Sequence, residues 1–125
     1  MTTNAPPQGN FRKEQPPILE KIISAYKLWH GYFDHLPKLS RYAIGNRIDS
    51  RFLEFIESVY FGLYSPKENR NLVIEEISRK LDALKLLLRI SWEIRILDTK
   101  KYSTLSIPLA EIGKIIGGWK KQIIE

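Results

Sequence analysis

Residues 44–63 read IGNRIDSRFLEFIESVYFGL and place an apolar side chain at every third or fourth position. A helix turns once in about 3.6 residues, so this spacing gathers those side chains on one helical face. The face consists of Ile44, Ile48, Phe52, Phe55, Val59 and Leu63. The stretch therefore predicts an amphipathic helix that buries one side in a core, with Ser40 as its N-cap.

Three further segments on either side of this stretch repeat the same spacing. They are residues 18–36, 66–98 and 106–123. No segment alternates apolar and polar side chains with a period of two, and no Asn-Gly or Asp-Gly hairpin turn occurs. The sequence predicts an all-α, up-down four-helix bundle with short connections.

Prolines and polar residues indicate where the helices begin and end. Pro16-Pro17 opens the first helix, because the first turn tolerates the missing N–H, and Pro37 ends it. Ser65-Pro66 separates the second helix from the third. Residues 98–104 are expected to form a polar connection, and Ser106-Ile107-Pro108 is expected to begin the last helix.

The 125 residues fit one domain, residues 18–125, preceded by a disordered Pro-rich tail of residues 1–17 that holds four of the seven prolines. Cysteine is absent, which fits a reducing compartment. No apolar run approaches the length of about 18 residues that a membrane span needs. We expect a soluble, cytoplasmic protein that does not associate with a membrane.

The third predicted helix carries two apolar faces. Its first half uses Ile74, Ile77, Leu81, Leu84 and Leu88, and its second half uses Leu86, Ile90, Ile94 and Leu97. The second face is rotated from the first by about 160° at 100° per residue. One bundle core cannot cover both, so the second face is predicted to be an interface in a homo-oligomer.

The chain is basic, with 20 Lys and Arg against 14 Asp and Glu, and this net charge of +6 favours a polyanionic partner. Half of the excess lies in the last 27 residues. Two pairs of cations have helical spacing, Arg47 with Arg51 and Lys85 with Arg89, and a nucleobase could stack on Trp92 beside the second pair. In the alternative interpretation, Arg51 pairs with Glu54 and Arg89 with Glu93 on ordinary wet surfaces.

Residues for catalysis or metal binding are not apparent. His30 and His35 are five residues apart and point in different directions around one helix, so they cannot chelate one ion. No phosphate-binding glycine loop occurs. The glycines Gly113, Gly117 and Gly118 favour close helix packing, with recognition by the Gly-Gly-Trp turn as an alternative. We expect neither an enzyme nor a cofactor.

Three segments together resemble a known family: LPKLSRYAIGNRI (36–48), LDALKLLLRISWEIRIL (81–97) and EIGKIIGGWKKQ (111–122). They are similar to the accessory variability determinant (Avd) proteins of diversity-generating retroelements. Those proteins belong to a wider set of small four-helix bundles, some of them encoded in intervening sequences of ribosomal RNA genes.

The resemblance implies a homopentameric barrel without catalytic activity that binds the retroelement's reverse transcriptase and nucleic acid and supports mutagenic retrohoming. It implies basic positions at Lys38, Arg41, Arg47, Arg89 and Lys120. Acidic residues near those positions, Asp49, Glu93 and Asp98, depart from a continuous positive belt.

These observations lead to one functional expectation and one alternative. Cations are expected to contact phosphates of RNA, or of DNA as a second candidate. One group is Lys38, Arg41, Arg47, Arg51, Lys85, Arg89 and Arg95, and a second group is Lys114, Lys120 and Lys121. The alternative is a self-assembling bundle of the ribosomal intervening-sequence type, with a protein partner and no nucleic-acid role.

Overall fold

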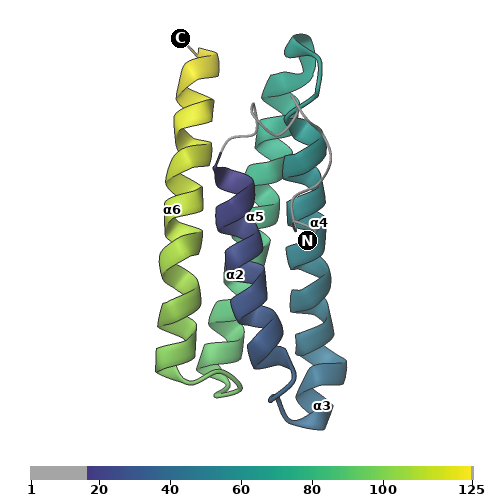
Figure 1. Ribbon diagram of the computed structural model, residues 1–125, viewed down its shortest axis with the longest axis vertical. Helices are drawn as coiled ribbons and strands as arrows, with labels where there is room; N and C mark the ends of the chain where they lie inside the picture. The colour runs from purple at the N-terminus through teal and green to yellow at the C-terminus, as the bar shows by residue number, and fades with distance from the viewer. Residues whose placement is uncertain (1–16, 125) are drawn as a thin grey trace, which may run out of the picture.

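The computed structural model describes residues 17–124, and this part of the chain is helical without any strand. The long helices are α2 (Ile18–Phe33), α4 (Asn46–Gly62), α5 (Arg70–Glu93) and α6 (Thr99–Ile124) (Figure 1). Short α3 (Lys38–Ser40) and a π-helical turn (Arg41–Gly45) lead into α4, and a 3₁₀ turn (Lys67–Asn69) leads into α5. The predicted all-α architecture is confirmed, while the predicted tail lies outside the described residues except for Pro17.

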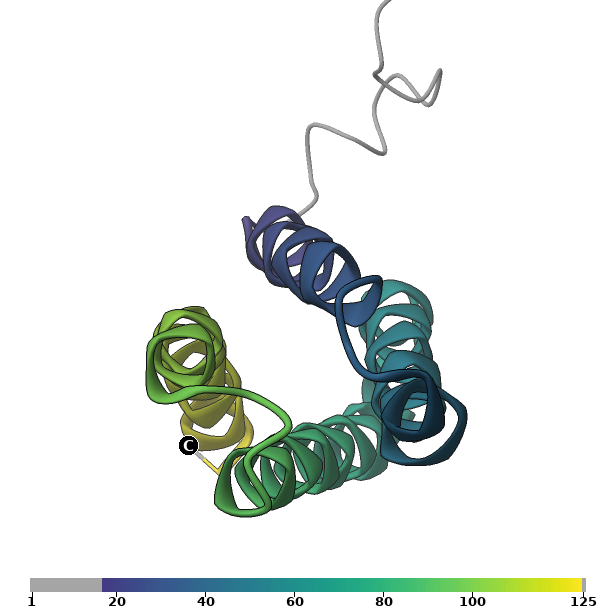
Figure 2. The ribbon, with the colours of Figure 1, turned by 90° about the horizontal axis from the view of Figure 1, so that it is seen from below.

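The helices run alternately down and up, beginning with α2, which descends in Figure 1. Figure 2, which looks along the bundle, shows α4 between α2 and α5, and α5 between α4 and α6. Helix α6 packs back against α2 and closes the ring. Sequential neighbours are therefore antiparallel, as expected of an up-down bundle with short connections.

The core lies along the bundle axis and consists of apolar side chains from all four long helices. Trp29, Phe52 and Phe55 are its largest fully buried members. Burying one large apolar side chain stabilises a fold by about 1.5–3 kcal/mol. The 20 buried apolar residues of the described chain therefore provide the main stabilisation of a protein without disulfides.

The second helical segment begins earlier than predicted. Helix α3 starts at Lys38, directly after Pro37, whose carbonyl accepts a hydrogen bond from the Arg41 N–H at 2.9 Å. Ser40 has helical backbone angles and its side chain caps nothing. The prediction of Ser40 as the N-cap is therefore wrong, because Pro37 already sets the chain direction one turn earlier.

The last helix also begins earlier than predicted, at Thr99 instead of Ser106. Asp98 is its N-cap, because Oδ1 accepts a hydrogen bond from the Lys101 N–H at 2.8 Å. Pro108 lies inside the helix. The predicted polar connection of residues 98–104 is wrong, since Leu105 is fully buried and anchors this additional turn in the core.

Helix α5 ends before residue 98 in a turn that holds Arg95 in the left-handed conformation, with φ of 66°. The Arg95 N–H donates to the Trp92 carbonyl at 3.1 Å, and the Ile96 N–H donates to the Ser91 carbonyl at 2.8 Å. These are the two hydrogen bonds of a Schellman motif, in which glycine is the usual left-handed residue. A Cβ in this conformation costs about 1–2 kcal/mol.

Helix α2 begins below the upper ends of the other three long helices (Figure 1). The uncovered ends of α4, α5 and α6 border a groove of about 610 Å³. Its apolar lining includes Leu63, Val73, Ile77 and Trp119. Helix α2 begins directly after Pro17, so the start of this helix sets the end of the groove.

Candidate nucleic-acid interface

The fold gathers the net charge at one end of the bundle. We name this half the connection end: it holds the α2–α3 and α5–α6 connections and comprises residues 26–53 and 84–110. It carries ten basic and four acidic residues, whereas the rest of the described chain carries eight of each. The entire excess of six positive charges in residues 17–124 therefore lies at the connection end.

Three of the four acidic residues at this end are engaged within the protein. Asp49 accepts hydrogen bonds from Tyr26 and Trp29, Glu93 accepts one from Arg89, and Asp98 caps α6. The fourth, Asp34, is exposed. Of these carboxylates Glu93 pairs with a cation of the same end, Arg89, and the ten basic residues still outnumber the four acidic ones, so the potential of the connection end is positive.

The predicted cations of α4 lie on one side of that helix. Arg47 is exposed, and no ion pair of this side chain occurs in the described part of the chain. Arg51 pairs with Glu54 at 3.6 Å, as the alternative interpretation expected. Both partners are well exposed, and such pairs contribute only about 0–1 kcal/mol. The pair can therefore open when a phosphate competes for the guanidinium.

The predicted cations of α5 face α6. Arg89 Nε donates to Glu93 Oε2 at 2.7 Å, and this hydrogen bond, with the charge of Glu93, raises the pKa of Arg89. The predicted ordinary pair is thus confirmed. A Cβ added to Gly113 would lie 3.3 Å from Lys85 Nζ. The Lys85 side chain therefore lies against α6 at Gly113. The contact is with a side chain, and a Cβ added to Gly117 or Gly118 would meet nothing within 4 Å, so the prediction that these glycines admit a close helix backbone is wrong.

The remaining cations of the first group lie around the α2–α3 and α5–α6 connections. Lys38 and Arg95 are exposed, and Arg41 is half-buried in the π-helical turn. Sequence reasoning missed Lys100 and Lys101, which belong to the first turn of α6 at the same end. Recognising Asp98 as an N-cap would have placed both lysines on a helix.

The second predicted group lies at the opposite end of the bundle. Lys114, Lys120 and Lys121 are all in the last three turns of α6, and Lys120 pairs with Glu75 at 3.8 Å. Acidic and basic residues balance in this half. The positive charges of these three lysines are thus offset in the fold by carboxylates of other helices, whereas Lys100 and Lys101 belong to the connection end.

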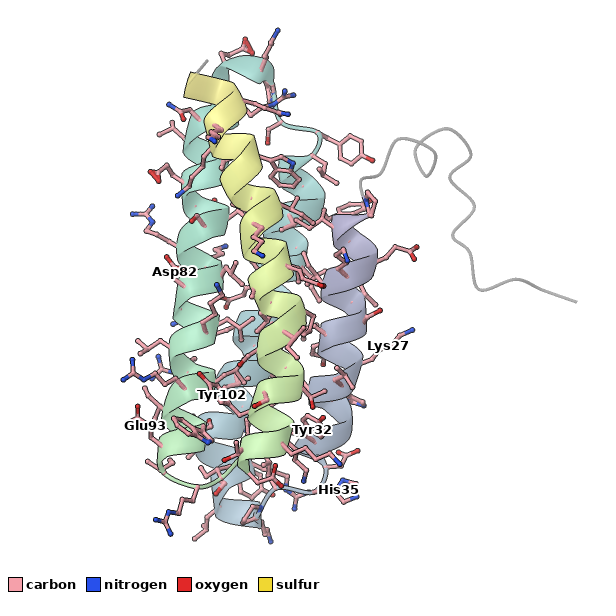
Figure 3. The ribbon with its side chains drawn as sticks, turned by 90° about the vertical axis from the view of Figure 1, so that its left-hand side faces the viewer. Lys27, Tyr32, His35, Asp82, Glu93 and Tyr102 are labelled. Atoms are coloured by element: carbon pink, nitrogen blue, oxygen red, sulfur yellow. The ribbon has the colours of Figure 1, made fainter. Side chains whose placement is uncertain are left out.

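An aromatic stack accompanies the cations of the connection end. The rings of Trp92 and Tyr102 are nearly parallel, at 10°, with centroids 5.1 Å apart. Figure 3 shows Tyr102 on α6 and Glu93 on α5 at the same end of the bundle. Lys101 Nζ lies 5.5 Å from the centre of the Tyr32 ring, a cation–π contact. Sequence reasoning identified Trp92 but missed Tyr102.

The second apolar face of α5 is only partly as predicted. Leu86, Ile90 and Ile94 are 55%, 38% and 57% exposed. Leu97 is 1% exposed, so its assignment to this outward face is wrong. The reason is the Schellman turn, which reverses the chain after Ile94 and directs Leu97 into the core.

Within residues 17–124, no group of three or more His, Asp or Glu side chains is placed so that it could hold a metal ion. His35 Nδ1 lies 3.0 Å from the Gly31 carbonyl, and His30 packs beside the ring of Tyr26. Among the helices described, none is both long enough and apolar enough to cross a membrane.

The described chain is a small all-helical bundle with one cationic end and an exposed apolar helix face. The sequence matches the bAvd-like family over residues 18–123, and the chain belongs to this family. Membership relates it to the accessory proteins of diversity-generating retroelements, a non-catalytic family. No curated protein matches the sequence.

Proposed function

We propose that this protein is an accessory subunit of a diversity-generating retroelement that binds nucleic acid through its connection end and also binds the reverse transcriptase. The observation that carries the proposal is the segregation of charge: all six excess positive charges of the described chain lie in one half. Family membership supplies the biological setting.

The mechanism is electrostatic positioning. Arg47, Lys38 and Arg95 would contact phosphates, which fixes a strand on the protein without reading its sequence. Each neutralised phosphate releases counterions, so the affinity should fall steeply as the salt concentration rises. A protein held on the template in this way brings the bound polymerase close to it.

Assembly into a homopentamer would strengthen this effect, because five connection ends would act together. The exposed face of Leu86, Ile90 and Ile94 is the proposed contact between protomers. Apolar side chains that line up along one helix face favour burial against a second copy. The expected mass of the assembly is about 73 kDa, five times the 14.6 kDa of one chain.

The test compares two charge-reversal variants. Arg47→Glu/Arg89→Glu removes cations from the connection end, and Lys114→Glu/Lys121→Glu makes the same change in charge at the opposite end. We expect the first variant to lose affinity for a structured RNA at 50 mM salt and the second to retain it. Both should keep the mass of the unmodified assembly in light scattering.

Equal affinity of both variants and the unmodified protein would contradict the proposed interface. For the unmodified protein, binding should weaken about 10³-fold or more between 50 and 200 mM salt if six or more phosphates are contacted. Absence of binding at 50 mM would favour the alternative function, a self-assembling bundle with a protein partner only. Co-purification with the reverse transcriptase tests the second part of the proposal.

A further inference from the structure

The connection end holds an aromatic surface that its phosphate contacts would not use. Trp92 is 37% exposed, and Tyr102 stacks on its indole at 5.1 Å. Trp92 Nε1 donates to Thr99 Oγ1 at 3.1 Å, which fixes the rotation of the ring. The structure thus presents a large aromatic side chain in a defined orientation at the surface.

A cavity of about 630 Å³ borders this ring. It is lined by residues from the end of α5 and the start of α6: Trp92, Glu93, Arg95, Leu97, Asp98 and Thr99. Its apolar side is formed by the indole of Trp92, and its cation is Arg95. An apolar wall beside one positive charge suits a planar ring that carries a phosphate.

The two carboxylates of the cavity do not prevent the binding of an anion. Glu93 Oε2 accepts the hydrogen bond from Arg89, and Asp98 Oδ1 accepts the one from the Lys101 N–H. Arg89 offsets the charge of Glu93, and the positive N-terminal end of α6 partly offsets that of Asp98. Arg95 forms no ion pair within the described residues, so its guanidinium can bind a ligand.

The backbone at Arg95 gives an independent indication. Its φ of 66° places an arginine where a Schellman motif favours glycine. Strained conformations of this kind cluster at functional sites, where the surrounding structure holds them. An arginine at this position, beside the exposed Trp92, indicates that its guanidinium serves binding and not the stability of the turn.

We propose that an unpaired nucleobase stacks on Trp92 in this cavity while Arg95 binds the adjoining phosphate. The inference rests on the proposed function and specifies it: the connection end would prefer single-stranded over double-stranded nucleic acid. Bases in a duplex are already stacked on both sides, whereas an unpaired base offers a free face to an aromatic ring.

The experiment measures the affinity of the full chain for a single-stranded RNA 12-mer and for the matching duplex. Trp92→Leu removes the ring, and Trp92→Phe keeps a smaller one. Loss of the stack should weaken single-strand binding about 5- to 150-fold, since stacking contributes about 1–3 kcal/mol per base. The Phe variant should recover part of this loss, and duplex affinity should change little in both variants.

Arg95→Gly is the second variant, and it keeps the inference testable if Trp92→Leu fails to fold. Relief of the left-handed strain should raise its melting temperature, while its single-strand affinity should fall. A purely structural arginine would not give this combination. Arg79→Ala is the matched control, because Arg79 is an exposed cation at the opposite end of the bundle and alanine, unlike glycine, is tolerated inside a helix. This variant should leave the affinity unchanged.

Tryptophan fluorescence gives a direct signal, because Trp29 is buried in the core and Trp119 lies at the opposite end of the bundle. The 12-mer should quench the emission of the unmodified protein and leave that of Trp92→Phe largely unquenched. Equal single-strand affinity of Trp92→Leu and the unmodified protein would overturn the inference, while salt-sensitive duplex binding would still uphold the proposed function. Binding of neither strand form would instead refute the proposed function. Adenosine monophosphate that binds as tightly as the 12-mer would overturn the assignment to a strand and indicate a free nucleotide.

Discussion

The hydroxyl of Tyr26 donates a hydrogen bond to Asp49 Oδ1 at 2.8 Å and thereby joins α2 to α4. The indole Nε1 of Trp29 donates to the same oxygen at 3.1 Å. Trp29 is fully buried, so its N–H depends on this carboxylate as its hydrogen-bond acceptor. One acidic side chain therefore satisfies two aromatic donors at the edge of the core.

Replacing Asp49 with alanine should lower the free energy of unfolding by about 1–3 kcal/mol, because buried donors lose their acceptor. Urea denaturation measures this change. Asp34→Ala is the control, since Asp34 is exposed, and surface substitutions of this kind usually change stability by less than about 0.5 kcal/mol. Equal stability of the two variants would contradict the role of Asp49.

The same contact predicts a dependence on alkaline pH. Burial, and then the hydrogen bond and the charge of Asp49, raise the pKa of Tyr26 from 10.0 to about 12. The protonated phenol is thus favoured in the folded state, and its contribution is fully present below pH 10. Stability should fall as the pH rises from 10 towards 12, and Tyr26→Phe should remove this part of the decline in thermal unfolding curves.

Two glycines in helices should respond in opposite ways to alanine. At Gly31 an added Cβ meets nothing within 4 Å, so Gly31→Ala should stabilise the protein by about 0.5–1 kcal/mol. At Gly62 the Cβ would lie 2.8 Å from Val73 Cγ1 and 3.0 Å from Ile77 Cδ1. Gly62→Ala should therefore be destabilising relative to Gly31→Ala in the same urea titration, and a larger gain at Gly62 would contradict the packing there.

Pro108 explains why the last helix was placed too late from the sequence. Proline is common in the first turn of a helix, so the sequence favoured a start near Ser106. The structure instead begins α6 at the Asp98 cap and buries Leu105 and Leu109 on either side of Pro108. The burial of Leu105 and Leu109 thus outweighs the preference of Pro108 for the first turn of a helix. This burial depends on the packing of other helices and cannot be predicted from the local sequence.

Pro108→Ala should consequently stabilise the bundle. The substitution restores an N–H that can bond the carbonyl four residues earlier, at Thr104, and it removes the clash of the ring with that carbonyl. The expected gain is about 1–3 kcal/mol, up to the full helix-interior penalty of proline. Circular dichroism during thermal unfolding measures it, and an unchanged or lower melting temperature would indicate that α6 is already adapted to a kink.

The positions of several candidate cations on their helices were predictable, but the surface that they form was not. Helical spacing correctly placed Arg47 with Arg51 on α4, and the family resemblance correctly identified the family. The segregation of charge could not be predicted, because it depends on which helix ends meet. Lys114 and Lys120 are basic in sequence, yet the fold sets them opposite Glu75 and Asp82 along the α5–α6 groove.

The exposed face of α5 leads to the last prediction. Leu86→Lys/Ile90→Lys places two charges on the proposed protomer contact. Burying a charge without an ion-pair partner is unfavourable. The proposed assembly of about 73 kDa should then dissociate towards the 14.6 kDa chain in light scattering, with helical content retained. Ile107→Lys is the matched control, because Ile107 is a similarly exposed apolar residue on α6. An unchanged mass of the double variant, or an equal decrease in mass of the control, would contradict this contact and indicate that the protomers meet through another helix.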